Sequence, residues 1–226
     1  MTIRAVAWDV DGTLVDSEPL HHVALLEACR NWNVDISDIS EDSFRGVHMG
    51  DVWRVIAPRM PASATERDWM RANDEYYVKH RRVLKPMPQA IETIAALATA
   101  GIVQICVSNA GRIILDANID ALGLSTWMEF TLSLDDVTEG KPDPELYETG
   151  CARLGLMPGQ VAAVEDSAPG RQSARAAGLV VIAYDHLGER VTQADYVIRD
   201  LSKLPSLIGA HRPATMPVAL HGTGGN

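Results

Sequence analysis

Residues 86–198 alternate short strand-like runs with stretches of helical periodicity, and a further strand-like run lies near the start of the chain. The strand-like runs lie at residues 3–10, 102–107, 129–134, 161–164 and 179–183, and a short edge strand is expected at 195–198. Most of these runs are apolar nearly throughout, which is typical of strands covered on both faces in a parallel sheet. Strands that alternate with helices predict an α/β fold, a Rossmann-like open parallel sheet with helices on both faces.

The segment between the first strand and the second carries a different pattern. Residues 18–32 and 69–80 place apolar side chains at helical spacing, and no strand pattern is found between residues 16 and 85. We therefore expect an all-helical cap domain inserted into the α/β core. The expected boundaries are 1–15 and 86–208 for the core, 16–85 for the cap, and 209–226 for a tail that is expected to be disordered.

The 226-residue chain carries 30 acidic and 20 basic residues, a formal net charge of −10. This balance disfavours binding to nucleic acid or to an anionic membrane surface. Cys29, Cys106 and Cys151 show neither metal-ligand spacing nor a disulfide framework, and are expected to be reduced structural thiols. Neither a signal peptide nor an apolar run of transmembrane length is found, so a cytoplasmic location is expected, with the oligomeric state left open.

Two carboxylates lie at the end of the first expected strand, in the sequence Asp9-Val10-Asp11-Gly12-Thr13. Acids this close repel each other unless a cation lies between them or their pKa values are driven apart. Gly12 allows the tight turn that directs both side chains toward one point. The segment therefore predicts a functional site beyond the carboxyl end of the strand, where open α/β sheets bind their ligands.

Three further groups of polar residues lie near the ends of other expected strands. They are Ser108-Asn109 after 102–107, Gly140-Lys141-Pro142-Asp143-Pro144 before a helix, and Glu165-Asp166-Ser167 after 161–164. Oxygen ligands without His or Cys suit Mg²⁺, which usually shares its ligands with a phosphate. A serine and a lysine at the same edge can hold and neutralise phosphoryl oxygens.

Taken in order, these four segments resemble the four motifs of the haloacid dehalogenase (HAD) superfamily. The run from Asp16 to His21 and the helical insertion resemble its helical-cap subgroup of small phosphatases and β-phosphoglucomutase-like proteins. The resemblance implies a phosphoric monoester hydrolase that uses Mg²⁺ and forms an aspartyl-phosphate. Asp9 would be the nucleophile, and Asp11 the general acid and then the base for water.

The same resemblance implies how the remaining motif residues act. Mg²⁺ would be held by the Asp9 side chain, the Asp11 backbone carbonyl and Asp166, with Glu165 as a further ligand or as a partner of the ligands. Phosphate would be bound by Ser108, Asn109 and Lys141. Two residues keep alternatives open: Ser167 is expected to cap the next helix, and Asp143 either shapes its loop or contacts Lys141.

Two functions share these core residues: a phosphatase acting on a small phosphorylated metabolite, such as a sugar phosphate or phosphoglycolate, and a β-phosphoglucomutase-like phosphomutase. His21 matches a histidine of mutase-like relatives and is equally compatible with a hinge-packing histidine. Arg45 could meet a second anionic group of the substrate. Met49 stands where the mutase pattern has a phosphate-gripping arginine, which favours the phosphatase. A non-catalytic binding relative is disfavoured because the catalytic aspartates are present, and the cap pattern does not name the substrate.

Overall fold

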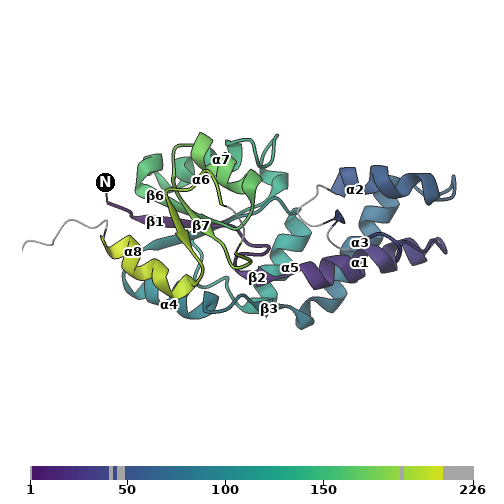
Figure 1. Cartoon of the computed structure of the whole chain (residues 1–226), viewed down its shortest axis with the longest axis horizontal. Helices are drawn as coiled ribbons and strands as arrows, with labels where there is room; N and C mark the ends of the chain where they lie inside the picture. Colours follow the sequence, from purple (N-terminus) through teal and green to yellow (C-terminus); the bar gives the residue numbers. More distant parts are fainter. Residues whose placement is uncertain (1, 41–42, 45–48, 189–190, 211–226) are drawn as a thin grey trace, which may run out of the picture.

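The computed structural model describes residues 2–40, 43–44, 49–188 and 191–210. These residues form two lobes, one built around a sheet and the other of helices only (Figure 1). The helical lobe consists of α1 (Glu18–Arg30), α2 (Met49–Ile56) and α3 (Glu66–His80). Short 3-10 helices lie at Ala57–Arg59, Arg81–Val83, Leu134–Asp136, Pro158–Gln160 and Leu201–Lys203.

A six-stranded parallel sheet forms the core of the other lobe. Its strands in spatial order are β5 (Thr131–Leu132), β4 (Val103–Val107), β1 (Ala5–Trp8), β6 (Val161–Glu165), β7 (Val180–Tyr184) and β8 (Tyr196–Ile198). The central strand β1 pairs Ala5 with Val103 on one side and with Val161 on the other. The predicted parallel sheet, including its edge strand, is confirmed.

Helices cover both faces of this sheet. One face carries α4 (Ala90–Thr99), α5 (Arg112–Leu122) and α8 (Leu204–Ala210), and the other carries α6 (Glu145–Leu154) and α7 (Ala168–Ala176). Because side chains alternate along a strand, Val6 and Trp8 pack under the first group, and Ala5 and Ala7 under the second. Trp8 is fully buried, and its indole N–H donates to Gln104 Oε1 at 3.0 Å.

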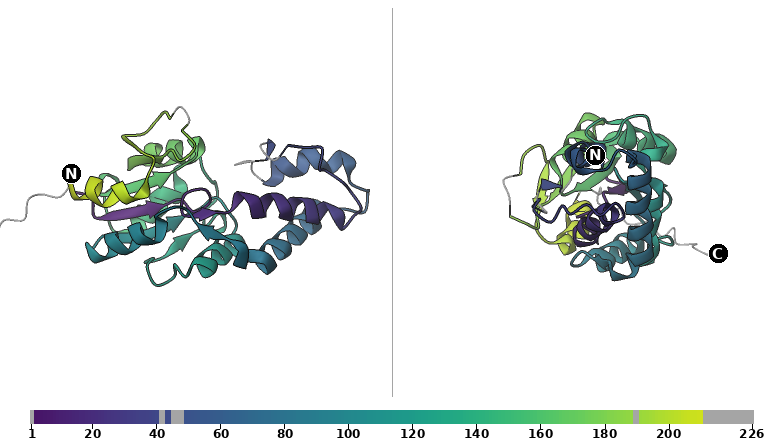
Figure 2. Two further views of the ribbon diagram at one scale, coloured as in Figure 1. Left: turned by 60° about the horizontal axis from the view of Figure 1, so that its bottom comes forward. Right: turned by 90° about the vertical axis from the view of Figure 1, so that its right-hand side faces the viewer.

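The helical lobe has an apolar cluster of its own. Leu25, Val52, Ile56 and Trp69 bring α1, α2 and α3 together in this cluster, and α1 packs along α3 (Figure 2). The α3 helix begins after Thr65, whose hydroxyl accepts the Asp68 N–H at 3.1 Å. The predicted helical insertion is confirmed. The α2 helix is an addition to the expected helices, although Val52 and Ile56 lie at helical spacing within it.

A two-stranded antiparallel ribbon lies where the chain passes between the lobes. β2 (Val15–Asp16) pairs with β3 (Lys85–Pro86), so the outgoing and returning segments lie side by side. Strands of two residues are too short to show a periodicity, which is why the sequence did not predict them. This ribbon pairs the two segments through which the chain passes between the core and the helical lobe. The predicted domain boundaries at residues 16 and 85 fall in these segments.

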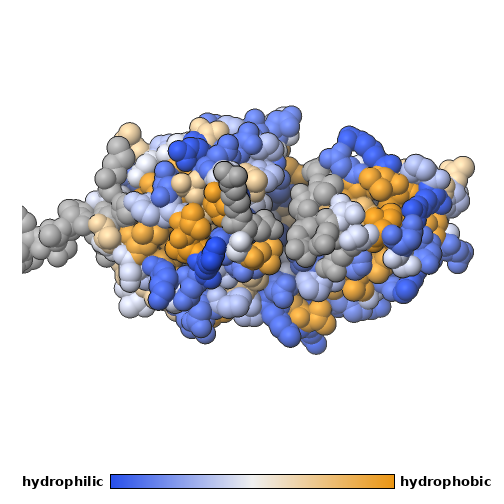
Figure 3. Space-filling view, viewed as in Figure 1, coloured by the Kyte–Doolittle hydropathy of each residue, from blue (hydrophilic) through white to orange (hydrophobic). Residues whose placement is uncertain are grey.

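The last described helix, α8, includes residues 209 and 210, and residues 211–226 lie outside the described part of the chain. Within the described residues, no helix combines the length and the apolar character needed to cross a membrane. Hydrophilic and hydrophobic residues are interspersed over both lobes on the face drawn in Figure 3.

Candidate active site

The polar residues predicted near the strand ends meet at the carboxyl edge of the sheet. Asp9 directly follows β1, Ser108 follows β4, Glu165 ends β6, and Lys141 reaches this edge from the loop before α6. β4 and β6 flank β1, and the chain order of the sheet reverses there. Such reversal points are where open α/β sheets bind ligands.

Lys141 is the centre of the buried part of the site. Its Nζ lies 2.7 Å from Asp9 Oδ1, 2.6 Å from Glu165 Oε1 and 2.8 Å from the carbonyl oxygen of Val107. Only 3% of the lysine side chain is exposed. A buried ammonium with three oxygen partners is fully hydrogen-bonded, so its position is fixed relative to Asp9.

Burial and the neighbouring charges shift the pKa values of these groups. Burial raises the pKa of Asp9 well above its ordinary value; Lys141 opposes this shift, whereas Glu165 and Asp166 add to it. Burial alone would lower the pKa of Lys141, but Asp9 and Glu165 raise it, so the ammonium stays charged. Burial, with the charge of Glu165, raises the pKa of Asp166 to about 7. Three carboxylates around one lysine leave an excess of negative charge that a cation would neutralise.

Glu165 is fully buried and is held from several sides. Besides the Lys141 ion pair, Oε1 accepts the hydroxyl proton of Tyr147, and Oε2 accepts that of Ser167 at 3.3 Å. A Cβ on Gly170 would lie 1.8 Å from Oε2, so the first turn of α7 closes tightly over this carboxylate. These contacts make Glu165 a support for Lys141 in addition to a candidate metal ligand.

Asp9, Glu165 and Asp166 each place a carboxylate oxygen within 4.8 Å of the others. Gly12, with φ of +78°, lies against this cluster, and a Cβ there would lie 2.2 Å from Asp166 Oδ2. Only glycine allows so close an approach in this backbone conformation. The three carboxylates exceed the single positive charge of Lys141 by two negative charges. An acidic, oxygen-only set of this kind fits a divalent cation, for which Asp9 and Asp166 are candidate side-chain ligands.

Asp11 lies beside this cluster but has a different set of partners. Its Oδ1 accepts Asn118 Nδ2–H at 2.9 Å and lies 3.4 Å from His21 Nε2, while Ser108 Oγ donates to Oδ2 at 3.3 Å. Burial alone would raise the pKa of Asp11, but His21 and the amide of Asn118 lower it below its ordinary value. The two aspartates of the first motif therefore have separate environments. In the metal-free protein the pKa directions, raised for Asp9 and lowered for Asp11, are the reverse of those that an ionised nucleophile and a protonated acid require, so the predicted roles depend on added positive charge at Asp9.

Ser108 and Asn109 follow β4 and hydrogen-bond to backbone groups of the loops at the site. The Ser108 hydroxyl accepts the Ala110 N–H at 3.0 Å. The Asn109 side chain makes two hydrogen bonds with the backbone of Lys141, accepting from its N–H at 2.7 Å and donating to its carbonyl at 3.0 Å. Asn109 thus holds the loop that delivers Lys141, a contact that the sequence did not reveal.

A family model for haloacid dehalogenase-like hydrolases matches residues 3–178, which include every residue of the site described above. The chain belongs to the haloacid dehalogenase-like hydrolase family. This confirms the identification made from the four motifs.

Relatives of this HAD-like hydrolase align with nearly all of the chain. Validoxylamine A 7′-phosphate phosphatase of Streptomyces hygroscopicus subsp. limoneus is 27% identical, over 89% of this chain and 95% of that protein. The plasmid phosphoglycolate phosphatase of Cupriavidus necator is 30% identical, over 93% and 95% respectively. The crystal structure of CbbY from Rhodobacter sphaeroides in complex with phosphate has a TM-score of 0.80 at 26% identity, covering 90% of this chain and 96% of that one. The names of the two phosphatases support the predicted class of enzyme, a phosphoric monoester hydrolase.

Other predicted residues of the HAD-like hydrolase have defined places. Ser167 caps α7 by accepting the Gly170 N–H at 3.2 Å, and Asp143 accepts the Glu145 N–H at 3.0 Å at the start of α6, which is the loop-shaping alternative. Met49 packs against the apolar cluster of the helical lobe. Arg45 lies outside the described residues.

No pattern in the sequence marks Tyr147, Asn118 or Tyr77 as part of a site. Each lies at a buried position of an amphipathic helix, where a tyrosine or an asparagine gives no local sign of a functional contact. A polar residue inside the apolar stripe of a helix is the only available signal, and it names no partner.

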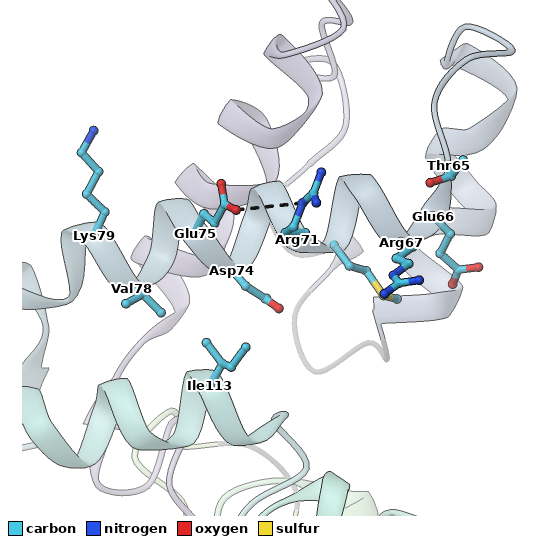
Figure 4. A pocket seen from close by; sticks show the side chains of 10 residues that line it. Thr65, Glu66, Arg67, Arg71, Asp74, Glu75, Val78, Lys79 and Ile113 are labelled. Atoms are coloured by element: carbon cyan, nitrogen blue, oxygen red, sulfur yellow. Dashed lines mark ion pairs between the residues drawn. The ribbon is translucent and has the colours of Figure 1, made fainter.

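A groove of about 930 Å³ runs between α3 and the start of α5, apart from the acidic cluster (Figure 4). Side chains of α3 form one wall, including Arg71 and Glu75, which lie 3.9 Å apart as an ion pair. From α5, Ile113 lies across from Asp74 and Val78. None of the residues of the acidic cluster lines this groove. Its size therefore does not make it the site of the chemistry.

Proposed function

We propose that this HAD-like hydrolase is a Mg²⁺-dependent phosphatase that hydrolyses a small phosphorylated metabolite through an aspartyl-phosphate intermediate. The observation that carries the proposal is the pairing of Asp9 with Lys141 at 2.7 Å beside Asp166, while Asp11 is held by other partners. Lys141 and a bound Mg²⁺ would oppose the effect of burial and keep Asp9 ionised as the nucleophile, and Asp11, whose side chain lies outside the acidic cluster, would carry the proton. The phosphate bound to CbbY and the substrates named for the two phosphatases support a phosphate monoester as the reactant.

In the first half-reaction, a carboxylate oxygen of Asp9 attacks phosphorus and the bond from phosphorus to the leaving oxygen breaks. Asp11 donates its proton to that leaving oxygen, so the alcohol departs neutral. Ser108 and Lys141 hold the phosphoryl oxygens as charge moves onto them. Mg²⁺, held by Asp9, Asp166 and the Asp11 carbonyl, would supply positive charge to the same oxygens.

In the second half-reaction, water hydrolyses the aspartyl-phosphate. The Asp11 carboxylate accepts a proton from the water, whose oxygen attacks phosphorus and displaces the Asp9 carboxylate. Inorganic phosphate leaves, Asp9 is free again and Asp11 is again protonated. The helical lobe would keep bulk water from the site during these steps.

The phosphomutase alternative uses the same core residues and differs in returning the phosphate to a sugar. It requires the helical lobe to grip a second phosphate. Met49 offers no charge for that grip and packs against apolar side chains instead, which favours the phosphatase. A sugar monophosphate supplied with its bisphosphate separates the two, because a mutase yields the isomerised sugar phosphate and a phosphatase yields inorganic phosphate.

The proposal is tested by measuring the inorganic phosphate released from an aryl phosphate and from a panel of sugar phosphates and phosphoglycolate. Each reaction is run with Mg²⁺ and with a chelator. Release that depends on Mg²⁺ is the expected result, and the panel ranks the substrates. A protein that releases no phosphate from any ester, or equally much in the chelator, contradicts the proposal.

We also propose the cap boundaries 16–85, with the core at 1–15 and 86–208, and a cytoplasmic location. The antiparallel ribbon at both chain crossings supports these boundaries. The net charge of −10 supports the absence of nucleic-acid and membrane partners.

A further inference from the structure

A line of hydrogen bonds connects the helical lobe with Asp11 through the core. Asn118 on α5 donates from Nδ2 to Asp11 Oδ1 at 2.9 Å, and its Oδ1 accepts the hydroxyl proton of Tyr77, on α3, at 2.7 Å. Asn118 and Tyr77 are both fully buried. Because neither side chain is exposed to solvent, each of the two bonds fixes the orientation of its partners.

The chemistry of the three groups allows one arrangement. A carboxylate accepts hydrogen bonds, so the amide NH₂ of Asn118 must face Asp11, and its oxygen must then face away. The Tyr77 hydroxyl, whose pKa is raised by burial and by the charge of Asp11, remains a donor and fills that acceptor. Reversing the amide would set its oxygen against the carboxylate and leave two buried groups unsatisfied.

We propose that Asn118, held in place by Tyr77, is a positioning residue that aims the Asp11 carboxyl at the leaving oxygen of the substrate. This role rests on the proposed phosphatase function. The bond from Asn118 fixes Oδ1, which leaves Oδ2, on the Ser108 side, to carry the proton to the leaving group. None of the four motifs contains Asn118 or Tyr77.

The same arrangement ties the alignment of Asp11 to the helical lobe. Tyr77 belongs to α3 and His21 to α1, their ring centroids lie 4.4 Å apart, and both reach toward Asp11, one directly and one through Asn118. The acid is therefore fully aligned when the helical lobe is seated against α5. Tyr77 thus links the position of the helical lobe to Asp11 through the side-chain amide of Asn118.

Leaving-group dependence distinguishes positioning of the acid from a purely structural role. An aryl phosphate with a good leaving group departs without a proton, whereas an alkyl phosphate needs one. The quantity to compare is kcat/KM for glycerol phosphate or another alkyl phosphate that the wild type accepts, divided by kcat/KM for p-nitrophenyl phosphate. Because kcat/KM covers the steps up to departure of the leaving group, it excludes the later role of Asp11 toward water.

The variants are Asn118→Ala, the milder Tyr77→Phe, and Asp11→Asn as the reference for complete loss of the acid. Gln104→Ala is the matched control, since Gln104 is also a buried amide that bridges a ring N–H and a carbonyl, those of Trp8 and Ile94, away from Asp11. We expect Asn118→Ala to lower the alkyl-to-aryl ratio about 10-fold, part of the roughly 10²- to 10⁴-fold that a general acid contributes. Tyr77→Phe should lower it less, and Gln104→Ala should leave it unchanged.

An Asn118→Ala protein that keeps the wild-type ratio, whether or not its total activity falls, overturns the positioning role. If that variant fails to fold, Tyr77→Phe decides in the same way, since it removes one hydroxyl only. A ratio lowered equally in Gln104→Ala also overturns the role, because it traces the effect to general loosening of the core. A wild type that releases phosphate from neither ester overturns the proposed function itself and this role with it.

Discussion

The ammonium of Lys141 lies 2.7 Å from the carboxylate of Asp9, and both side chains are buried. The two residues are 132 positions apart in the chain. Their contact occupies Oδ1 of Asp9, which leaves the other oxygen for attack on phosphorus or for a cation. It also offsets part of the repulsion among the three carboxylates, so we expect Lys141 to serve stability as well as catalysis.

Replacing Lys141 with Met should damage both properties. Removing one partner of a buried ion pair costs about 3–5 kcal/mol in the free energy of unfolding, and losing a donor to the reacting oxygens lowers kcat by about 10²- to 10³-fold. Thermal unfolding and phosphate release measure the two effects. Lys203→Met, at an exposed position, is the control and should change neither. A Lys141→Met protein with wild-type stability would show that the pair is not structural.

Asp9→Asn should remove turnover and leave the fold intact. The amide has nearly the shape of the carboxylate but cannot attack phosphorus, and loss of a nucleophile costs roughly 10⁴-fold or more in kcat. Circular dichroism should match the wild type, and binding of inorganic phosphate, followed by calorimetry, should persist. Turnover close to that of the wild type would exclude Asp9 as the nucleophile.

Gly12→Ala and Gly101→Ala separate backbone strain from crowding of the metal ligand. Both glycines have positive φ, +78° and +71°, but a Cβ on Gly12 meets Asp166 at 2.2 Å whereas a Cβ on Gly101 meets nothing within 4 Å. Each variant should lose about 1–2 kcal/mol of stability from the left-handed backbone. Gly12→Ala alone should also raise the Mg²⁺ concentration needed for half-maximal activity. Equal Mg²⁺ dependence in the two variants would contradict the tight contact with Asp166.

Binding of Mg²⁺ should stabilise the folded protein. A ligand present at 100 times its dissociation constant adds about 2.7 kcal/mol to the free energy of unfolding when it binds the folded state only. The melting temperature should therefore rise with MgCl₂ and not with NaCl of the same ionic strength. Asp166→Asn should abolish the rise. A melting temperature unaffected by MgCl₂ would mean that the acidic cluster does not hold the cation.

The metal-free protein should lose stability as pH rises toward neutrality. The pKa of Asp166, raised to about 7 by burial and by Glu165, lies above its value of about 3.9 in an unfolded chain. Between those two values the folded state holds a proton that the unfolded chain releases, so the free energy of unfolding falls as pH rises from about 4 to about 7. Urea unfolding in a chelator at pH 5 and pH 8 measures the difference, which should be smaller in Asp166→Asn. An equal difference in both proteins would assign it to other groups.

The α/β core and the motif residues were predictable because their signals are local. A buried parallel strand appears as an apolar run, and Asp9, Ser108 and Asp166 each stand within a residue of such a run. The parallel arrangement brings strand ends to one edge whatever the loops do. The ribbon of β2 and β3 left no such signal, since its strands are two residues long. The α2 helix carries apolar residues at helical spacing, but it is only eight residues long and follows polar, irregular sequence.

The sequence by itself determined the sheet, the helical insertion and the polar residues that meet at the carboxyl edge of the sheet. Only the tertiary structure decided which side chains hold those residues in place. Tyr147 donates a hydrogen bond to Glu165, and Asn109 accepts one from the backbone N–H of Lys141. Asn118, which accepts a hydrogen bond from Tyr77, donates one to Asp11. The physical reason is that a supporting side chain is defined by what it faces, and α3 meets α5 only after the chain has folded. An asparagine or a tyrosine at a buried helix position gives the same local sequence pattern whether its side chain faces an apolar core or the acid of an active site.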